Sequence, residues 1–139
     1  DKRMTRFNLS LSEAVDLVLF SIDASLGGEI FVPKIPSFKV IDLAKAIDSK
    51  IPFKNIGIRP GEKLHEEMIT AADSNNTLEF DKYYVIRPNS EFFNWELKKF
   101  LKKLKNKKFK YVDDDFTYNS FNNKKFLKIS DLKKIISKI

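Results

Sequence analysis

Residues 10–28, SLSEAVDLVLFSIDASLGG, constrain the fold more than any other stretch of this chain. Ser10 and Glu13 have the spacing of a helix capping box, and the two glycines at positions 27 and 28 are typical of a helix end. Large apolar side chains recur between them at the period of an α-helix. They are Leu11, Val15, Val18, Leu19 and Ile22. We therefore predict a helix that buries this face in the core of the chain.

Short segments of alternating type follow this helix. Runs of β-branched and aromatic residues predict strands, and apolar residues at helical spacing predict helices. The expected strands cover residues 29–33, 53–58, 77–80 and 83–88. The expected helices cover residues 36–49, 62–69, 90–104 and 130–139, the last with Ser130 as its N-cap. These elements are too few and too short for a nucleotide-binding sheet, so we expect one small α+β domain over residues 1–139 that looks like half of a larger unit.

The expected helix at residues 90–104 is strongly amphipathic. Lysines occupy one face, and apolar residues occupy the other. The apolar positions are Phe93, Leu97, Phe100, Leu101 and Leu104. We expect these side chains to pack on the core and the lysines to point into water.

Composition excludes several classes of protein. An apolar content of 42% with 13 phenylalanines argues against disorder, and no apolar run reaches the roughly 20 residues that a membrane-spanning helix needs. The chain has no cysteine, which excludes disulfides and thiolate metal sites and suits a cytoplasmic protein. Nothing near Asp1 resembles a signal peptide, and we expect this first residue to be a cut end.

The net charge of +7 is concentrated in the C-terminal part of the chain. Residues 1–97 carry a net −3, whereas residues 98–139 carry a net +10. Such asymmetry is found in modules that bind nucleic acid or a membrane surface. Lysine-rich amphipathic helices are also the commonest solvated helices, so we keep these two functions as alternatives and expect no nucleic-acid partner.

The short segment Arg59-Pro60-Gly61-Glu62 places two opposite charges around a turn. Proline restricts the backbone, and glycine permits conformations in which the chain approaches a ligand closely. On residues alone, an ordinary capped turn with Glu62 at a helix N-terminus explains the pattern. A ligand site with one cation and one anion explains it as well.

Three ordered blocks of sequence are recognisable as a family pattern. They are MTRFNLSLSEAVDLVL, GGEIFVPKIPSFKVIDLAKAI and GIRPGEKLHEEMI, and the run FTYNSFNNKKFL follows them. They resemble the C-terminal, substrate-binding half of the inverting UDP-N-acetylglucosamine 4,6-dehydratases. These are extended short-chain dehydrogenases/reductases that begin pseudaminic acid and related surface-polysaccharide pathways. Capsular-polysaccharide nucleotide-sugar epimerase/dehydratases share the T-R-F and G-E-K-L elements and remain the close alternative.

The resemblance implies a small substrate-binding domain without its Rossmann half. In this family NADP and a Tyr/Lys catalytic pair belong to the N-terminal half. The present chain has no glycine-rich phosphate loop and no Y-x-x-x-K sequence. We therefore expect no catalytic, cofactor-binding or metal-binding residue here, and an inactive fragment of a lyase. The implied partners are a UDP-sugar, the missing Rossmann half and further copies of the parent in a homo-oligomer.

The same resemblance assigns binding roles to individual residues. Arg6 and Arg59 are expected to straddle the diphosphate, because planar guanidiniums donate several hydrogen bonds to phosphate at once. Glu62 is expected to accept the ribose hydroxyls, since an ionised carboxylate suits the two donors of a cis-diol. The substrate-binding set also includes Lys34 in the VPKIPS loop and, closing over the nucleotide, Tyr118 and Asn123. His65 is expected to be structural.

Overall fold

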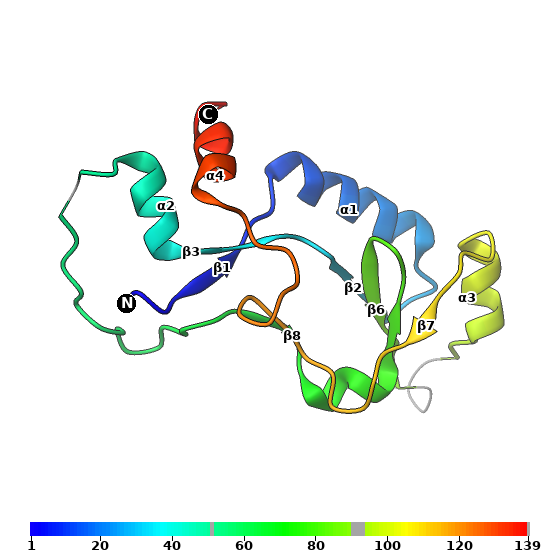
Figure 1. The fold of residues 1–139 in the computed structure, drawn as a ribbon. Coiled ribbons are helices and arrows are strands. Elements are labelled where there is room, and N and C mark those ends of the chain that lie inside the picture. The colour runs from blue at the N-terminus through cyan, green and yellow to red at the C-terminus, as the bar shows by residue number, and fades with distance from the viewer. Residues whose placement is uncertain (51, 90–93, 139) are drawn as a thin grey trace. The chain divides into compact units, whose positions relative to one another are not determined.

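The computed structural model describes residues 1–50, 52–89 and 94–138 (Figure 1). The chain forms two compact units, each assembled from segments distant in sequence. Unit 1 comprises Asp1–Asn8, Ile35–Glu67 and Tyr118–Ile139, and unit 2 comprises Leu9–Lys34 and Met68–Thr117. Helices and strands are mixed, as the α+β expectation required. A single domain over residues 1–139 stays a prediction.

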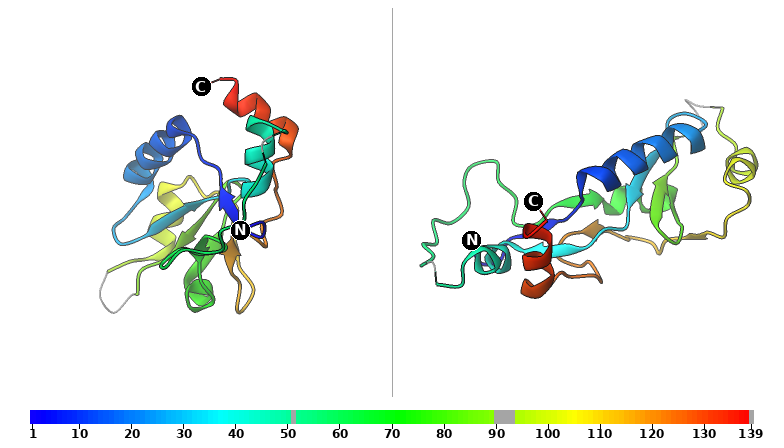
Figure 2. Two further views of the ribbon diagram at one scale, coloured as in Figure 1. Left: turned by 90° about the vertical axis from the view of Figure 1, so that its left-hand side faces the viewer. Right: turned by 90° about the horizontal axis from the view of Figure 1, so that it is seen from above.

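Unit 1 is built on a two-stranded sheet with two packed helices. Strand β1 (Thr5–Phe7) pairs antiparallel with β3 (Ser37–Lys39), and Arg6 lies opposite Phe38. Helices α2 (Val40–Ile47) and α4 (Ile129–Ile136) pack against each other, as both views of Figure 2 show. The short strand β8 (Tyr118–Asn119) also belongs to this unit. Its buried apolar side chains are Met4, Ile35, Ala46, Tyr118 and Leu132.

Unit 2 contains an antiparallel four-stranded sheet. Its strands are β2 (Ile30–Pro33), β5 (Thr77–Glu79), β6 (Tyr83–Ile86) and β7 (Lys110–Tyr111), in the order β2-β6-β5-β7. Its helical elements are α1 (Leu11–Ala24), the 3₁₀ helix η1 (Ala71–Asn76) and α3 (Leu97–Lys103). Strand β4 (Glu67–Ile69) crosses the sequence boundary between the units. No helix of the described residues is long and apolar enough to span a membrane.

The core of unit 2 lies where α3 and α1 meet the sheet. Leu78, Val85 and Phe100 are fully buried, and Phe20 and Phe31 pack at the edge of this cluster. The lysines of α3 are exposed, while Leu104 is buried, so the amphipathic prediction is confirmed for this helix. The helix begins at Leu97 rather than at residue 90. Residues 90–93, with the expected contact of Phe93, lie outside the described residues.

Helix α1 has the predicted capping box but not the predicted buried face. The Ser10 hydroxyl accepts the Glu13 N–H, and the Glu13 carboxylate accepts the Ser10 N–H. All five residues expected in the core, Leu11, Val15, Val18, Leu19 and Ile22, are exposed. The side of the helix toward the sheet carries Ala14, Leu17, Phe20 and Ala24 instead. That expectation was wrong because α1 is apolar on two faces, and the less bulky one packs.

Four other expectations need correction. Residues 53–58 form no strand and are mostly exposed. Residues 62–66 are irregular, with a bend at residues 64–65, and residues 67–69 form β4, so there is no helix at 62–69. Helix α2 begins at residue 40 rather than at residue 36, because residues 37–39 pair with β1. The N-cap of α4 is Lys128, which places Ser130 inside the helix.

Candidate functional site

The Arg59–Glu62 segment is a tight turn closed by its own side chains. The Glu62 N–H donates to the Arg59 carbonyl at 3.0 Å, and Gly61 has a φ of +80°. Proline followed by a residue with positive φ is the pattern of a type II turn, in which glycine is favoured at the third position. The Glu62 carboxylate also accepts the Arg59 backbone N–H at 3.1 Å. The turn therefore holds the Glu62 carboxylate beside the backbone of Arg59.

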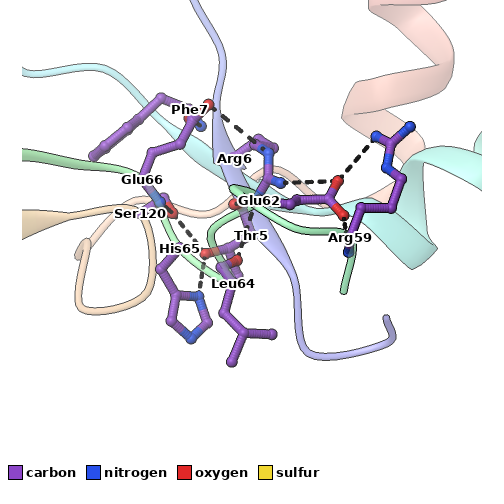
Figure 3. A network of polar contacts seen from close by, with 9 residues as sticks. All are labelled: Thr5, Arg6, Phe7, Arg59, Glu62, Leu64, His65, Glu66 and Ser120. Atoms are coloured by element: carbon purple, nitrogen blue, oxygen red, sulfur yellow. Dashed lines mark hydrogen bonds and ion pairs between the residues drawn. The ribbon is translucent and has the colours of Figure 1, made fainter. Parts of the chain in front are cut away.

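Two guanidiniums converge on this carboxylate (Figure 3). Glu62 Oε1 lies 3.2 Å from an Arg59 nitrogen and 3.9 Å from an Arg6 nitrogen. The side-chain and backbone hydrogen bonds from Arg59 lower the pKa of Glu62, which therefore stays ionised at neutral pH. The Arg59 side chain is 75% exposed, whereas those of Arg6 and Glu62 are 23% and 21% exposed. Arg59 is thus the more accessible of the two cations.

Arg6 is held more firmly than the sequence suggested. One of its amino groups donates to the Thr5 carbonyl at 2.7 Å and to the Leu64 carbonyl at 3.1 Å. Its Nε lies 3.8 Å from the Glu66 carboxylate. These contacts tie β1 to the segment that follows the turn. One amino group of Arg6 is therefore occupied by backbone carbonyls, and the expected contact of Arg6 with a diphosphate stays a prediction.

A network of hydroxyl groups on the other side of β1 supports this arrangement. The Thr5 hydroxyl lies 2.6 Å from the Ser120 hydroxyl and 2.8 Å from Nδ1 of His65. Ser120 Oγ accepts the Glu66 N–H at 2.9 Å, and the Glu66 carboxylate accepts the Phe7 N–H at 2.8 Å. These contacts join β1, residues 65–66 and the segment that contains Ser120. Thr5 and Ser120 are both buried.

Sequence reasoning did not identify Thr5, Glu66 or Ser120. The Tyr-x-Ser pattern within FTYNSFNNKKFL is the signal that could have indicated Ser120. His65, which the sequence predicted to be structural, also stacks on Phe121 with ring centroids 4.7 Å apart.

Tyr118 and Asn123 contact the backbone of the VPKIPS loop. The Tyr118 hydroxyl donates to the Ile35 carbonyl and accepts the Ile35 N–H, both at 3.0 Å. The Asn123 amide donates to the same carbonyl at 2.7 Å and to the Ser37 hydroxyl at 2.9 Å. Burial raises the pKa of Tyr118. Both side chains hold the loop in this structure, and their expected contact with a nucleotide stays a prediction.

Lys34 belongs to unit 2, where it pairs with a carboxylate. Its ammonium lies 2.7 Å from Glu79 Oε1 and 4.8 Å from the centroid of the Tyr84 ring. Lys110 approaches the other oxygen of Glu79 at 3.1 Å. Burial of Glu79 acts to raise its pKa, but the hydrogen bonds and charges of the two lysines outweigh that effect and lower the pKa. Lys34 is therefore paired within unit 2, and its expected contact with the substrate stays a prediction.

We predict that Glu79→Gln destabilises unit 2 by about 1 kcal/mol at pH 7. A carboxylate whose pKa is lowered by folding stabilises the folded state above its unfolded pKa, and this contribution is lost as the pH falls through the folded value. The difference between wild type and variant should therefore shrink below about pH 4. Urea unfolding of wild type and variant at pH 7 and below about pH 4 measures this difference in stability. Asp81→Asn, at an exposed position, is the control. A difference that is the same at both pH values would contradict the assignment.

Comparison with known proteins gives these residues a context. The model of the family described as "Polysaccharide biosynthesis protein" matches residues 1–88, which is more than half of the chain. The chain belongs to this family. The resemblance to the inverting dehydratases is also confirmed: the chain is 45% identical over 137 residues to the "UDP-N-acetylglucosamine 4,6-dehydratase (inverting)" of Campylobacter jejuni. That match covers 99% of this chain and 41% of the relative.

Two other known proteins are also similar to this chain. The chain is 34% identical over 137 residues to the "UDP-glucose 4-epimerase" of Rickettsia akari, a match that covers 96% of the chain and 38% of the relative. The X-ray structure of Pen from Bacillus thuringiensis matches with a TM-score of 0.76 at 24% identity, over 99% of this chain and 40% of that chain. This last match shows the fold alone. In all three comparisons the chain spans about two-fifths of the other protein.

Proposed function

We propose that this chain binds and orients the UDP-sugar in an inverting UDP-N-acetylglucosamine 4,6-dehydratase of pseudaminic acid or surface-polysaccharide biosynthesis. The family and the name of the Campylobacter jejuni relative support the enzyme class. The observation that carries the proposal is the Glu62 carboxylate, which a type II turn holds between Arg59 and Arg6. We further propose that the parent is a cytoplasmic homo-oligomer.

The geometry supports separate roles for the arginines and for Glu62 in binding a nucleoside diphosphate. A diphosphate carries about two negative charges and favours guanidinium forks. Arg59 can supply one, because exposed ion pairs such as that with Glu62 are weak and its remaining donors are free to rotate. The Glu62 carboxylate has acceptor capacity for both hydroxyls of a ribose. Arg6, one amino group of which binds backbone carbonyls, adds a second cation beside Glu62, and we propose that it binds the diphosphate together with Arg59.

The residues of this chain do not fit a nicotinamide cofactor. The sequence has four glycines, none in the spacing of a dinucleotide-binding loop, and it contains no Y-x-x-x-K pair. We therefore propose that NADP and the reacting groups belong to an N-terminal Rossmann part of the parent. This chain contributes binding energy remote from the reaction, which positions the sugar against chemistry held elsewhere.

A related nucleotide-sugar epimerase is the second candidate. The 34% identity to the Rickettsia akari protein favours it, and the same turn would bind UDP in either enzyme. The products distinguish them, because a dehydratase releases water and leaves a 4-keto sugar, whereas a 4-epimerase returns an isomer of its substrate.

The ribose role of Glu62 can be tested on the chain itself. We expect wild type to bind UDP weakly and saturably at low salt. Glu62→Gln should weaken UDP binding about tenfold, because hydrogen bonds to a charged group are lost. Binding of inorganic pyrophosphate should not weaken, since it has no ribose and the variant removes a competing anion. NMR titration with both ligands measures this.

Glu67→Gln is the matched control, because it makes the same change of charge at an exposed position of β4. It should leave UDP affinity unchanged. Equal loss of UDP and pyrophosphate binding in Glu62→Gln would contradict the ribose assignment, and UDP binding that is the same in all three proteins would overturn the proposed site.

A further inference from the structure

Helix α1 carries an outer stripe of large apolar side chains on its exposed side. We define the outer stripe as Leu11, Val15, Val18, Leu19 and Ile22. Their exposed fractions range from 49% for Val15 to 82% for Leu11. Contiguous apolar surface of this kind marks a site of interaction more often than a solvated face.

The opposite side of α1 is already engaged within unit 2. Phe20 packs against Phe31 and Tyr83, with ring centroids 5.7 and 4.9 Å apart, and Ala24 is buried in the same cluster. The helix therefore cannot rotate to bury the outer stripe without losing these contacts. A helix that is apolar on both sides is typical of the interior of a larger assembly.

The charges beside the stripe argue against a second copy of the same helix as its cover. Asp16 and Asp23 lie three residues before and four residues after Leu19, which places them along its edge. Residues 11–24 contain no lysine or arginine. A two-fold contact between two copies of α1 would bring like charges together without a compensating cation. The observations favour a different surface, apolar at its centre and neutral or basic at its rim.

We propose that the outer stripe of α1 is the docking surface for the part of the parent protein that this chain lacks. The polysaccharide biosynthesis relatives supply the reason: more than half of the Campylobacter jejuni protein lies outside the match, which itself covers 99% of this chain. The inference rests on family membership and not on UDP binding, so it succeeds or fails independently of the proposed function.

Cysteine alkylation tests this proposal directly, because the chain has no cysteine of its own. Ile22→Cys places a thiol in the outer stripe. Ile47→Cys is the matched control, since Ile47 is also a helical isoleucine and is 65% exposed against 70% for Ile22. Each variant is measured in the isolated chain and in a chimera of the Campylobacter jejuni relative in which this chain replaces the matched segment. Peptide mass spectrometry reads iodoacetamide labelling at the introduced site, without substrate.

We expect labelling at position 22 to be fast in the isolated chain and at least about tenfold slower in the chimera, while labelling at position 47 changes little. Equal rates at position 22 in both proteins would overturn the proposal. Slow labelling at position 22 in the isolated chain would also overturn the proposal. If the labelling slows further as the protein concentration rises, a second copy covers the outer stripe. If the labelling rate does not depend on protein concentration, other residues of the same chain cover it. If the chimera does not fold, the cysteine is placed at the aligned position of the Campylobacter jejuni relative instead. Slow labelling there would support the proposal, and labelling as fast as in the isolated chain would overturn it.

Discussion

Replacing Arg59 with alanine should lower kcat/KM for UDP-N-acetylglucosamine by about 100-fold in the chimera described above. Arg59 is the exposed guanidinium of the site, and its single side-chain hydrogen bond to Glu62 is readily exchanged for one to a diphosphate. Each hydrogen bond to a charged group contributes about 1.5–3 kcal/mol, and about 2.8 kcal/mol corresponds to a factor of 100. Arg6 alone should not compensate, because one of its amino groups binds the Thr5 and Leu64 carbonyls and a single guanidinium cannot span both phosphates.

Arg59→Lys should recover little of this loss, since a lysine keeps the charge but not the planar fork that reaches two phosphate oxygens. Arg3→Ala is the matched control. Arg3 is also an exposed arginine paired with a carboxylate, that of Asp1 at 2.7 Å. It should leave kcat/KM within about threefold of the unsubstituted chimera. Steady-state kinetics on the three variants measures the effect, and equal losses in Arg59→Ala and Arg3→Ala would mean that the turn has no special role.

Replacing Phe100 with alanine should destabilise unit 2 by about 4 kcal/mol. Phe100 is fully buried at the centre of the aromatic core, with Phe31, Phe80 and Trp95 rings within 5.3–6.4 Å. Removing its ring loses the transfer free energy of the side chain and leaves a cavity that short strands cannot fill by collapsing. The cost should therefore lie toward the upper end of the range for buried aromatic residues.

Trp95 provides the measurement, because it is the only tryptophan of the chain and packs against Phe100. Its fluorescence during urea unfolding reports on unit 2. Phe121→Ala, at a position 66% exposed in unit 1, is the control and should shift that transition by less than about 0.5 kcal/mol. A loss below about 1 kcal/mol for Phe100→Ala would show that α3 is not an integral part of the core.

Local features of the fold were predictable from the sequence by itself. The capping box of Ser10 and Glu13 and the Pro60-Gly61 turn depend on neighbouring residues, so their chemistry is visible in the sequence. The amphipathic pattern of α3 was equally clear, because only one of its faces is apolar. For the site, the family resemblance singled out Arg6, Arg59 and Glu62, and the fold brings these three side chains together.

Only the tertiary structure decided which of several compatible patterns is used. Helix α1 has two apolar faces, and its packing against Phe31 and Tyr83 selected the one with Ala14, Leu17 and Phe20. Long-range partners likewise determined the roles of Arg6 and Tyr118, because the Leu64 and Ile35 carbonyls that they bind lie 58 and 83 residues away in sequence. Periodicity reports that a side chain is apolar and how often it recurs, but the surface that covers it depends on segments far along the chain.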